Sequence, residues 1–477
     1  MGCEKMEFEG MREIIKEQAR ILNEMRETKA YRAVEGYHFL KAQRGVQKIQ
    51  TSGKVLKHIG GRPNKKIQVQ DPMEAVLKLQ ADMGRKLDIL EQEMRISQEC
   101  LQVPLKIQQE KERGRGVISV FAPYQIMNLP DGYSRRVKNI DDLLGNDMLR
   151  IYIAQDAGVT SKLPVCCFER DHYISIAYNG AIPEHCGFVS MVTRLTGIAY
   201  IHSVYQAMSS VSKDAGVIKL YDFHGVVPEE LLLMERDKEA DYYSQKESEL
   251  VQNANYIITA NQAMWDHISM KYPKCTARFI IMPMNNDDNN QEEKPSTEAI
   301  EREDKKPVVI YSGGLQKWQL IPEMQDAICK ERNECEFHIY VSDPDEFMRH
   351  WGDREAPDDW EITTKTAEEM KEVYRHAQYG FVLRDDIVVN NVACPTKIID
   401  YIKYDIIPIV KSPHIGDFER YGMEYLSLED FLQNRFPSSE RRMQMCRKNR
   451  EIIGKILEEY KLGRDIVERI IREKCFI

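Results

Sequence analysis

The sequence predicts an α/β protein with two open-sheet domains and an added helical region at its N-terminus. After Gly116, short apolar runs alternate with amphipathic stretches of helical spacing, which is typical of parallel sheets covered by helices. The alternation stops at 284–306, a stretch rich in Asn, Asp, Glu, Ser and Pro that cannot bury a core, and it restarts at Pro307. Because single cores rarely grow to 477 residues, two or three domains are expected. The expected segments are a helical region, a first α/β domain, an acidic linker, a second α/β domain and terminal helices, in the order 1–112, 113–283, 284–306, 307–438 and 439–477.

The composition narrows the class of protein. A net charge of -9 argues against nucleic-acid binding by the whole molecule. No run of eighteen apolar residues occurs and the N-terminus lacks a hydrophobic signal region, so we expect a cytoplasmic location. The eleven cysteines include no C-x-x-C pair, which favours reduced core thiols over a disulfide framework or a zinc site.

The region before residue 113 has no strand signal and carries its apolar residues at helical spacing. A 4-3 spacing runs from Val76 to Leu101 with charged residues between, and a weaker one runs from Phe8 to Met25. Two interpretations are open. The segments are either coiled-coil or hairpin helices that make a homo-oligomer through residues 1–112, or helices packed on the protein's own body.

Between these two helical patterns lies a basic segment. Residues Arg32 to Lys66 hold nine lysines and arginines against one acid, Glu35. Such a segment can hold an anionic membrane surface or a polyanionic partner, which would make the protein peripheral at the inner face of a membrane. The alternative is a solvated face without a partner.

The first α/β domain begins with a buried strand, 117–121, which leads through a turn containing Gly132 into a helix, as doubly wound sheets do. No G-x-G-x-x-G fingerprint is present. Ligands of such sheets bind at the carboxyl ends of strands, and His224 follows the strand 217–221 at such an end, so we take His224 as a candidate site residue. Further strands are expected at 150–153, 172–177, 199–202, 256–259 and 278–281.

The second α/β domain opens with the strand 307–311 and the turn Ser312-Gly313-Gly314. Glycines at a strand end let the backbone approach a ligand, and Lys317 follows closely enough to neutralise a phosphate. Arg384 follows the strand 379–383 and is expected on the same rim. Further strands are expected at 337–341, 360–363 and 406–410.

The most informative stretch is Asn390-Asn-Val-Ala-Cys-Pro-Thr-Lys-Ile-Ile-Asp-Tyr401, between two predicted buried strands. Proline is favoured at the first position of a helix, so we expect Pro395 to begin a helix that Cys394 caps. The amides of the first turn then offer a phosphate site. Asp400, one turn further on the same face, can accept hydrogen bonds from ribose hydroxyls. The pair of features predicts a nucleoside diphosphate, and the alternative is an amphipathic helix with a solvated Asp400.

Three motifs together resemble the retaining family-4-type glycosyltransferases, especially those of bacterial surface-polysaccharide assembly. They are Tyr311-Ser-Gly-Gly-Leu-Gln-Lys-Trp-Gln, Asp222-Phe-His-Gly-Val-Val-Pro-Glu-Glu and Val392-Ala-Cys-Pro-Thr-Lys-Ile-Ile-Asp-Tyr. The likeness covers roughly residues 115 to 470. It implies the GT-B fold, in which two Rossmann-like domains face each other across a cleft, with the nucleotide-sugar donor on the C-terminal domain and the acceptor mainly on the N-terminal one.

The resemblance also implies roles for residues of the second domain. Lys317 matches the basic residue that meets the diphosphate. Thr396 and Lys397 match the helix start under the phosphates. Asp400 matches the second acid of the family's E-x7-E pattern, which holds the ribose.

The remaining positions extend this implied site. His224 resembles the loop residue that faces the sugar, and Gly132 matches the glycine loop beside the donor phosphates. The first acid of E-x7-E falls at Val392, so Asn390 and Asn391 are the nearest polar candidates for the sugar hydroxyls. The expected donor-binding residues are Gly132, Gly313, Gly314, Lys317, Asn390, Asn391, Pro395, Thr396, Lys397 and Asp400, and those at the reacting centre are His224, Lys317 and Arg384.

The activity implied by the resemblance is transfer of a hexose-type sugar from a nucleotide-diphosphate sugar to a glycan or lipid-linked acceptor, with retention. Helix amides and Lys317 would stabilise charge on the leaving diphosphate, so we expect no metal, no other cofactor and no side-chain nucleophile. Two alternatives remain. One is a GT-B sugar-nucleotide epimerase or phosphorylase, and the other is a coiled-coil scaffold whose GT-B body no longer reacts, which the missing acid at Val392 favours.

Overall fold

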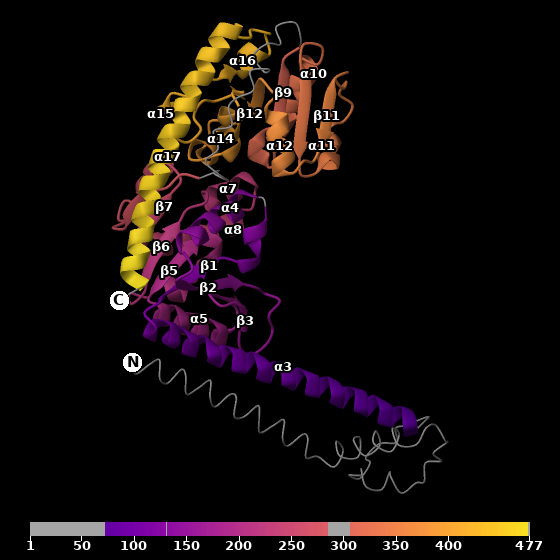
Figure 1. Cartoon of the computed structure of the whole chain (residues 1–477). Helices are drawn as coiled ribbons and strands as arrows, with labels where there is room; N and C mark the ends of the chain where they lie inside the picture. The colour runs from indigo at the N-terminus through magenta and orange to yellow at the C-terminus, as the bar shows by residue number, and fades with distance from the viewer. Residues whose placement is uncertain (1–71, 130, 285–305, 476–477) are drawn as a thin grey trace. The chain divides into compact units, whose positions relative to one another are not determined.

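The computed structural model describes residues 72–129, 131–284 and 306–475 (Figure 1). The helical pattern from Phe8 to Met25 and the basic segment Arg32 to Lys66 lie outside the described residues. The chain divides into two compact units. The smaller contains the chain up to Arg113 together with Ile153–Leu195, and the larger contains Gly114–Tyr152 and Thr196–Ile477.

The first sheet has the strand order β3-β4-β2-β1-β5-β6-β7-β8. Its pairs are parallel from β2 through β1 to β8, and His202 lies opposite Asp222 at the carboxyl ends of β5 and β6. The buried apolar runs that predicted these strands fill the core on both faces, as expected where helices cover a parallel sheet. The strands are β1 (Gly116–Phe121), β2 (Met148–Gln155), β3 (Val165–Arg170), β4 (Tyr173–Tyr178), β5 (Ile198–His202), β6 (Ile218–Asp222), β7 (Tyr256–Thr259) and β8 (Arg278–Ile281).

The expected strands of this sheet are confirmed to within two residues at their ends, and β3 was missed. Strand β3 pairs antiparallel with β4. Its sequence ends in charged residues and most of its side chains are exposed, so it has no continuous apolar run to predict it.

The second sheet is parallel throughout, in the order β11-β10-β9-β12-β13-β14. One face packs on α10, α11 and α16, and the other packs on α12, α14 and part of α17. The fold class expected from the sequence, two Rossmann-like parallel-sheet domains, is therefore confirmed. The strands are β9 (Val308–Gly313), β10 (Glu336–Val341), β11 (Trp360–Thr363), β12 (Tyr379–Val382), β13 (Ile407–Val410) and β14 (Leu426–Ser427).

Helices connect the strands of both sheets. The helices that precede or connect the strands of the first sheet are α3 (Pro72–Glu112), α4 (Gly132–Leu143), α5 (Pro183–Thr196), α6 (Ser209–Ser212), α7 (Val227–Leu233), α8 (Asp237–Asn253) and α9 (Gln262–Lys271). Beside the second they are α10 (Ile321–Lys330), α11 (Pro344–Trp351), α12 (Ala367–Tyr374), α13 (Val388–Asn391), α14 (Thr396–Lys403), α15 (Phe418–Tyr421), α16 (Leu428–Phe431) and α17 (Ser439–Cys475). No helix in the described ranges is both long and apolar enough to cross a bilayer.

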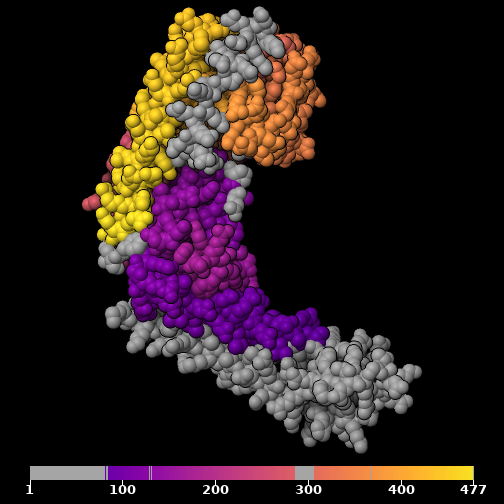
Figure 2. Space-filling view, in the orientation of Figure 1, coloured from indigo at the N-terminus to yellow at the C-terminus, as the bar shows by residue number. Residues whose placement is uncertain are grey.

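The terminal segment forms one long helix, α17, which contacts elements of both sheets within the larger unit. It packs on β1, β5 and β8 and also on α14, α15 and β13. In Figures 1 and 2 it is the yellow segment that runs along the larger unit. Gly463 permits this approach, because a Cβ there would lie 2.3 Å from the carbonyl oxygen of Ile281.

In the smaller unit, α3 packs on β3. The side chains of Ile96, Cys100, Val103 and Ile107 are buried there, and the Cys100 and Cys166 sulfur atoms lie 3.5 Å apart as free thiols. For this end of α3, packing on the protein's own body is therefore the observed arrangement. A coiled coil stays a prediction for the rest of the region.

Candidate functional site

Two groups of polar side chains lie at the carboxyl edges of the two sheets, and the first surrounds the end of β9. That strand ends at Gly313, whose φ of +150° is rare for other residues. A Cβ at this position would lie 2.8 Å from Lys397 Nζ, so a side chain here would displace the end of the lysine from the strand end. The tyrosine hydroxyl of Tyr311 donates to the carbonyl oxygen of Gly314 over 2.5 Å and holds the glycine turn closed.

Lys397 reaches this position because it stands in the first turn of α14. The helix begins at Thr396 with Pro395 as its N-cap, one residue later than the sequence predicted, so Cys394 is not the cap. Pro395 has an extended ψ of 117° that a helical residue cannot have, while its carbonyl oxygen accepts from the Ile398 amide. With the helix beginning at Thr396, Lys397 lies inside the first helical turn, where the helix dipole favours an anion.

The Lys397 side chain is only 8% exposed. Its Nζ donates to Gln319 Oε1 over 3.0 Å and lies 4.1 Å from the centre of the Tyr311 ring. Burial, together with the nearby charge of Arg384, holds the pKa of Lys397 well below its usual range. A buried ammonium held by neutral groups alone is a costly arrangement for a protein without a ligand.

Arg384 is the second buried cation of this edge, and it is 4% exposed. Its Nη1 donates to Asn390 Oδ1 over 2.8 Å, and its buried Nε has no hydrogen-bond partner. Burial lowers the pKa of Arg384 to about 10. In the part of the chain that the structure describes, neither Arg384 nor Lys397 has a carboxylate within ion-pair distance.

The two asparagines expected at a sugar lie beside this pair. Asn390 is fully buried, accepts from Arg384 and donates to the carbonyl oxygen of Asp385, so it positions Arg384. Asn391 donates to Asp386 Oδ1, and its own Oδ1 is buried without a partner. Val392, where the resemblance leads one to expect an acid, is buried.

Lys317 and Asp400 occupy different surroundings from the buried cations. Lys317 is 54% exposed, and its Nζ lies 2.9 Å from Oε1 of the exposed Glu235. Asp400 is half-buried on α14. The pKa values of the neighbouring Tyr374 and Tyr401 hydroxyls are raised, mainly by burial and to a smaller extent by the charge of Asp400. The structure thus brings Gly313, Arg384 and Lys397 together, with Gln319 and Tyr311 as members that the sequence did not single out.

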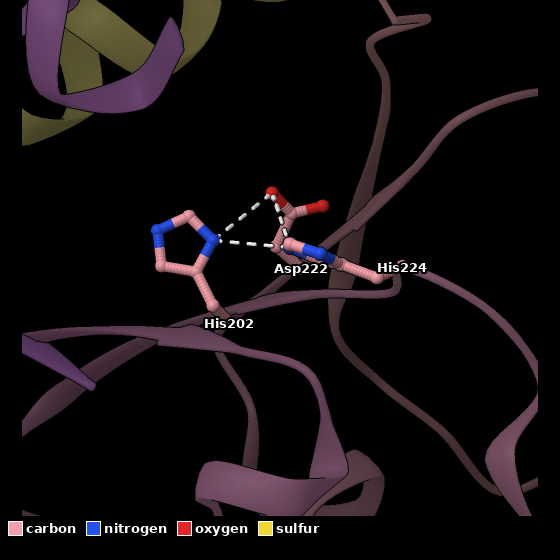
Figure 3. Close-up of side chains that lie close together, drawn as sticks. All are labelled: His202, Asp222 and His224. Atoms are coloured by element: carbon pink, nitrogen blue, oxygen red, sulfur yellow. Dashed lines mark hydrogen bonds and ion pairs between the residues drawn. The ribbon is translucent and has the colours of Figure 1, made fainter. Parts of the chain in front are cut away.

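The second group of side chains lies at the carboxyl ends of β5 and β6 (Figure 3). His202 Nδ1 lies 3.0 Å from His224 Nε2, and Asp222 Oδ2 lies 3.9 Å and 3.7 Å from these two nitrogens. His202 and Asp222 are fully buried, whereas the His224 side chain is 11% exposed. His224 is therefore the member of this group that a ligand can reach.

Asp222 is neutralised by Arg136 from α4. The guanidinium donates Nε to Oδ2 over 2.8 Å and Nη2 to Oδ1 over 3.0 Å, and the Tyr200 hydroxyl donates to Oδ2 over 2.8 Å. Burial alone would raise the pKa of Asp222, but the charge of Arg136 holds it well below its usual range. The same burial, with His224 close by, lowers the pKa of His202.

Three ligand-type atoms this close together suggest a metal ion, and the hydrogen bonds argue against one. Asp222 Oδ2 already accepts from Arg136 and from Tyr200, which occupies both of its lone pairs. A cation bound there would also lie beside the Arg136 guanidinium. The group fits a hydrogen-bonded pair of histidines beside a neutralised carboxylate.

Gly132 stands at the start of α4, which carries side chains into this group. Asp131 caps the helix by accepting from the Ser134 amide over 3.0 Å. Tyr133, the next residue, places its ring 4.7 Å from the ring of His224. Arg136, Asp222 and His202 were not predicted as site residues, although Asp222 and His202 stand at the ends of predicted strands.

Comparison with known proteins bears on the fold. No protein-family model matches the chain, and no curated protein matches it. Among solved structures, the chain is similar to sucrose-phosphate synthase from Thermosynechococcus elongatus, with a TM-score of 0.53 and 12% identity over 75% of this chain and 99% of that one. It is also similar to Anabaena HepE in complex with UDP and glucose, with a TM-score of 0.52 and 12% identity over 75% and 99% of the two chains.

A third similar structure is WaaG, a glycosyltransferase involved in lipopolysaccharide biosynthesis, with a TM-score of 0.51 and 11% identity over 74% of this chain and 99% of that one. At such low identity these likenesses establish the fold alone. The chain has the GT-B fold, in agreement with the expectation from its motifs.

Proposed function

We propose that this protein is a glycosyltransferase whose donor is a nucleotide-diphosphate sugar bound at the carboxyl edge of the second sheet. The observation that carries the proposal is the buried pair Arg384 and Lys397, which lacks a carboxylate partner among the described residues. Two buried like charges are costly unless an anion joins them. A diphosphate supplies that charge, and the first turn of α14 supplies further favourable potential.

The rest of the donor extends from the diphosphate. Asp400, on the same helix, is the proposed ribose acceptor. The glycine turn at Gly313 and Gly314 leaves room for backbone to approach the phosphates, and the exposed Lys317 is proposed to reach them when the donor is bound. HepE, one of the similar structures, is described in complex with UDP-glucose, which supports a nucleoside diphosphate sugar as the ligand class.

In the proposed reaction, Arg384 and Lys397 stabilise the charge that develops on the leaving diphosphate. Preorganised charges in a water-poor site are effective in this role, because they need no reorientation during the reaction. No side chain is assigned as nucleophile, and retention with a phosphate oxygen taking the acceptor proton remains part of the proposal. The acceptor is proposed to be a glycan or a lipid-linked sugar.

The scaffold alternative is less well supported. A protein that no longer binds a donor gains nothing from two unneutralised buried cations, which lower the stability of its fold.

A panel of UDP, GDP, CMP and ADP, each at millimolar concentration with and without magnesium, tests the proposal by thermal unfolding. A ligand at a hundred times its dissociation constant stabilises the fold by about 2.7 kcal/mol. A selective response to one diphosphate, independent of magnesium, is expected. The absence of any response from the folded protein would contradict the proposal.

A further inference from the structure

The geometry points to His202 as a positioning residue that sets the tautomer of His224, so that His224 offers an Nδ1–H group as a hydrogen-bond donor to the oxygen atoms of a bound sugar. This inference rests on the proposed function for the identity of the ligand. The tautomer itself follows from the contacts of the two rings.

The sheet register brings the two histidines together. His202 is the last residue of β5 and lies opposite Asp222, the last residue of β6. His224 follows two residues later and turns back, so that its Nε2 meets His202 Nδ1 at 3.0 Å. At this distance the two nitrogens share a hydrogen bond, so one of them carries the proton and donates it and the other is the acceptor.

Both rings are held in place by aromatic contacts. The Tyr200 ring centre lies 4.6 Å from that of His202, and the Tyr133 ring centre lies 4.7 Å from that of His224. The backbone after His202 is strained, since Ser203 has a φ of 65° and a ψ of 154° and its amide donates to the Asp222 carbonyl oxygen. Strain of this kind persists where the surrounding contacts fix the backbone.

The second nitrogen of His202 decides between the two tautomers. His202 Nε2 is buried and has no hydrogen-bond partner. If His224 Nε2 carried the shared proton, neutral His202 would carry its own proton on Nε2, as a buried donor without an acceptor. If His202 Nδ1 carries the proton, Nε2 is only an unpaired acceptor, which proteins tolerate better than an unpaired buried N–H.

Burial and the neighbouring Arg136 oppose a second proton on His202. The neighbouring carboxylate of Asp222 is already neutralised by Arg136 through two hydrogen bonds. A second positive charge, on His202, would be fully buried next to Arg136. The shared proton therefore lies on His202 Nδ1, and His224 Nε2 accepts it.

A neutral histidine whose Nε2 accepts must carry its proton on Nδ1. His224 then reaches its ligand as a donor and has no lone pair facing the ligand with which to remove a proton. Its partner is an oxygen with an available lone pair, such as a sugar hydroxyl. The role of His224 in the proposed transfer is to bind and orient the sugar.

The test is the protonation state of the ring nitrogens, measured by two-bond proton–nitrogen NMR correlations on the full chain labelled with nitrogen-15 in histidine. His202→Asn and His224→Asn assign the two rings by loss of signals. Without ligand near pH 7.5, we expect protons on Nδ1 of both His202 and His224. A proton on His224 Nε2 in the wild-type protein overturns the inference, whatever the nucleotide panel shows.

Two variants separate positioning from simple packing. His202→Phe keeps a ring and removes the donor to His224 Nε2, so the His224 proton is no longer held on Nδ1 and a population with the proton on Nε2 is expected. His202→Asn keeps an N–H near the position of Nδ1, so the His224 proton is expected to stay on Nδ1. An unchanged His224 tautomer in the phenylalanine variant also contradicts the inference.

UDP affinity separates this inference from the proposed function. It is expected to stay within threefold of wild type in both variants, because the buried cations that bind the diphosphate belong to the other sheet. If wild-type protein shows the expected tautomers and does not bind UDP or another member of the panel, the proposed function fails while the tautomer assignment stands.

Discussion

Replacement of Lys397 by methionine is expected to make the unliganded protein more stable while it removes binding of the diphosphate. Methionine keeps an unbranched stem over the Tyr311 ring and removes the buried ammonium. Stability is expected to rise because the charge of Arg384 no longer faces a second cation. Most large-to-small or charge-removing changes in a core do the opposite, so the sign is diagnostic.

The magnitude follows from the burial of the two cations. Burial lowers the pKa of Arg384 to about 10. The same burial penalises the Lys397 ammonium, whose pKa also lies well below its usual range. Exchanging buried charges for apolar groups of similar volume gains about 1–4 kcal/mol, and loss of the hydrogen bond to Gln319 costs about 1 kcal/mol. The expected net gain for Lys397→Met is about 0–3 kcal/mol.

Urea unfolding, followed with and without the diphosphate selected by the panel, measures both effects. Lys306→Met is the matched control, because Lys306 is exposed, stands before β9 at the opposite edge of the same sheet and pairs with Asp359. Its free energy of unfolding is expected to stay within about 0.5 kcal/mol of wild type, with ligand binding retained. Lys397→Met should raise the midpoint and lose the response to the diphosphate.

The pH dependence supplies a further check on Lys397. Its folded pKa lies below the unfolded value of ~10.4, so the folded state binds fewer protons between these two values and wild-type stability rises with pH in that window. The gain of Lys397→Met over wild type should therefore shrink as the pH approaches 10. A variant that is less stable than wild type at pH 7 and still responds to the diphosphate would refute the proposed role of the buried pair.

Three further predictions concern other positions. Asp400→Ala should weaken nucleotide binding by about tenfold or more, as expected for loss of a charged hydrogen-bond acceptor, with little change in the urea midpoint; unchanged affinity in calorimetry would remove Asp400 from the ribose site. Ser203→Gly should stabilise the fold by about 1 kcal/mol, since relief of about 1–3 kcal/mol of backbone strain exceeds the entropy cost of glycine; a lower urea midpoint would contradict the strain. Because burial holds the folded pKa of His202 below its unfolded value of ~6.5, wild-type stability relative to His202→Asn should fall as the pH drops from 7 to 5, and a constant difference would show that His202 titrates normally.

In the second domain, local sequence patterns predicted most strands and helices but not which side chains meet. The alternation of apolar runs predicted its strands except the two-residue β14, and proline before an amphipathic stretch predicted α14 to within one residue. Arg384 was placed on the correct rim because it follows a strand end. Lys317 was chosen as the principal phosphate ligand from its closeness to the glycines in sequence, yet Lys397, 84 positions after Gly313, is the lysine that reaches the glycine.

The first domain shows the same limit. His224 was found because functional residues gather at the carboxyl ends of parallel strands. Its surroundings were not predicted, since Arg136 and Asp222 are separated by 86 positions and meet only when α4 packs beside β6. Strand β3 was missed because it lies largely exposed and lacks an apolar run.

The sequence by itself determined the order of most strands and helices, and also the glycine turn and the helix start that frame the proposed donor site, because periodicity, turn residues and capping act over a few neighbouring positions. Only the tertiary structure decided which charges are buried and which are neutralised. Arg136 met a carboxylate and Arg384 and Lys397 did not, since ion pairing depends on which strand ends the sheet brings side by side. The burial and pairing of the charged side chains therefore follow from the fold, whereas the types of side chain that are available follow from the sequence.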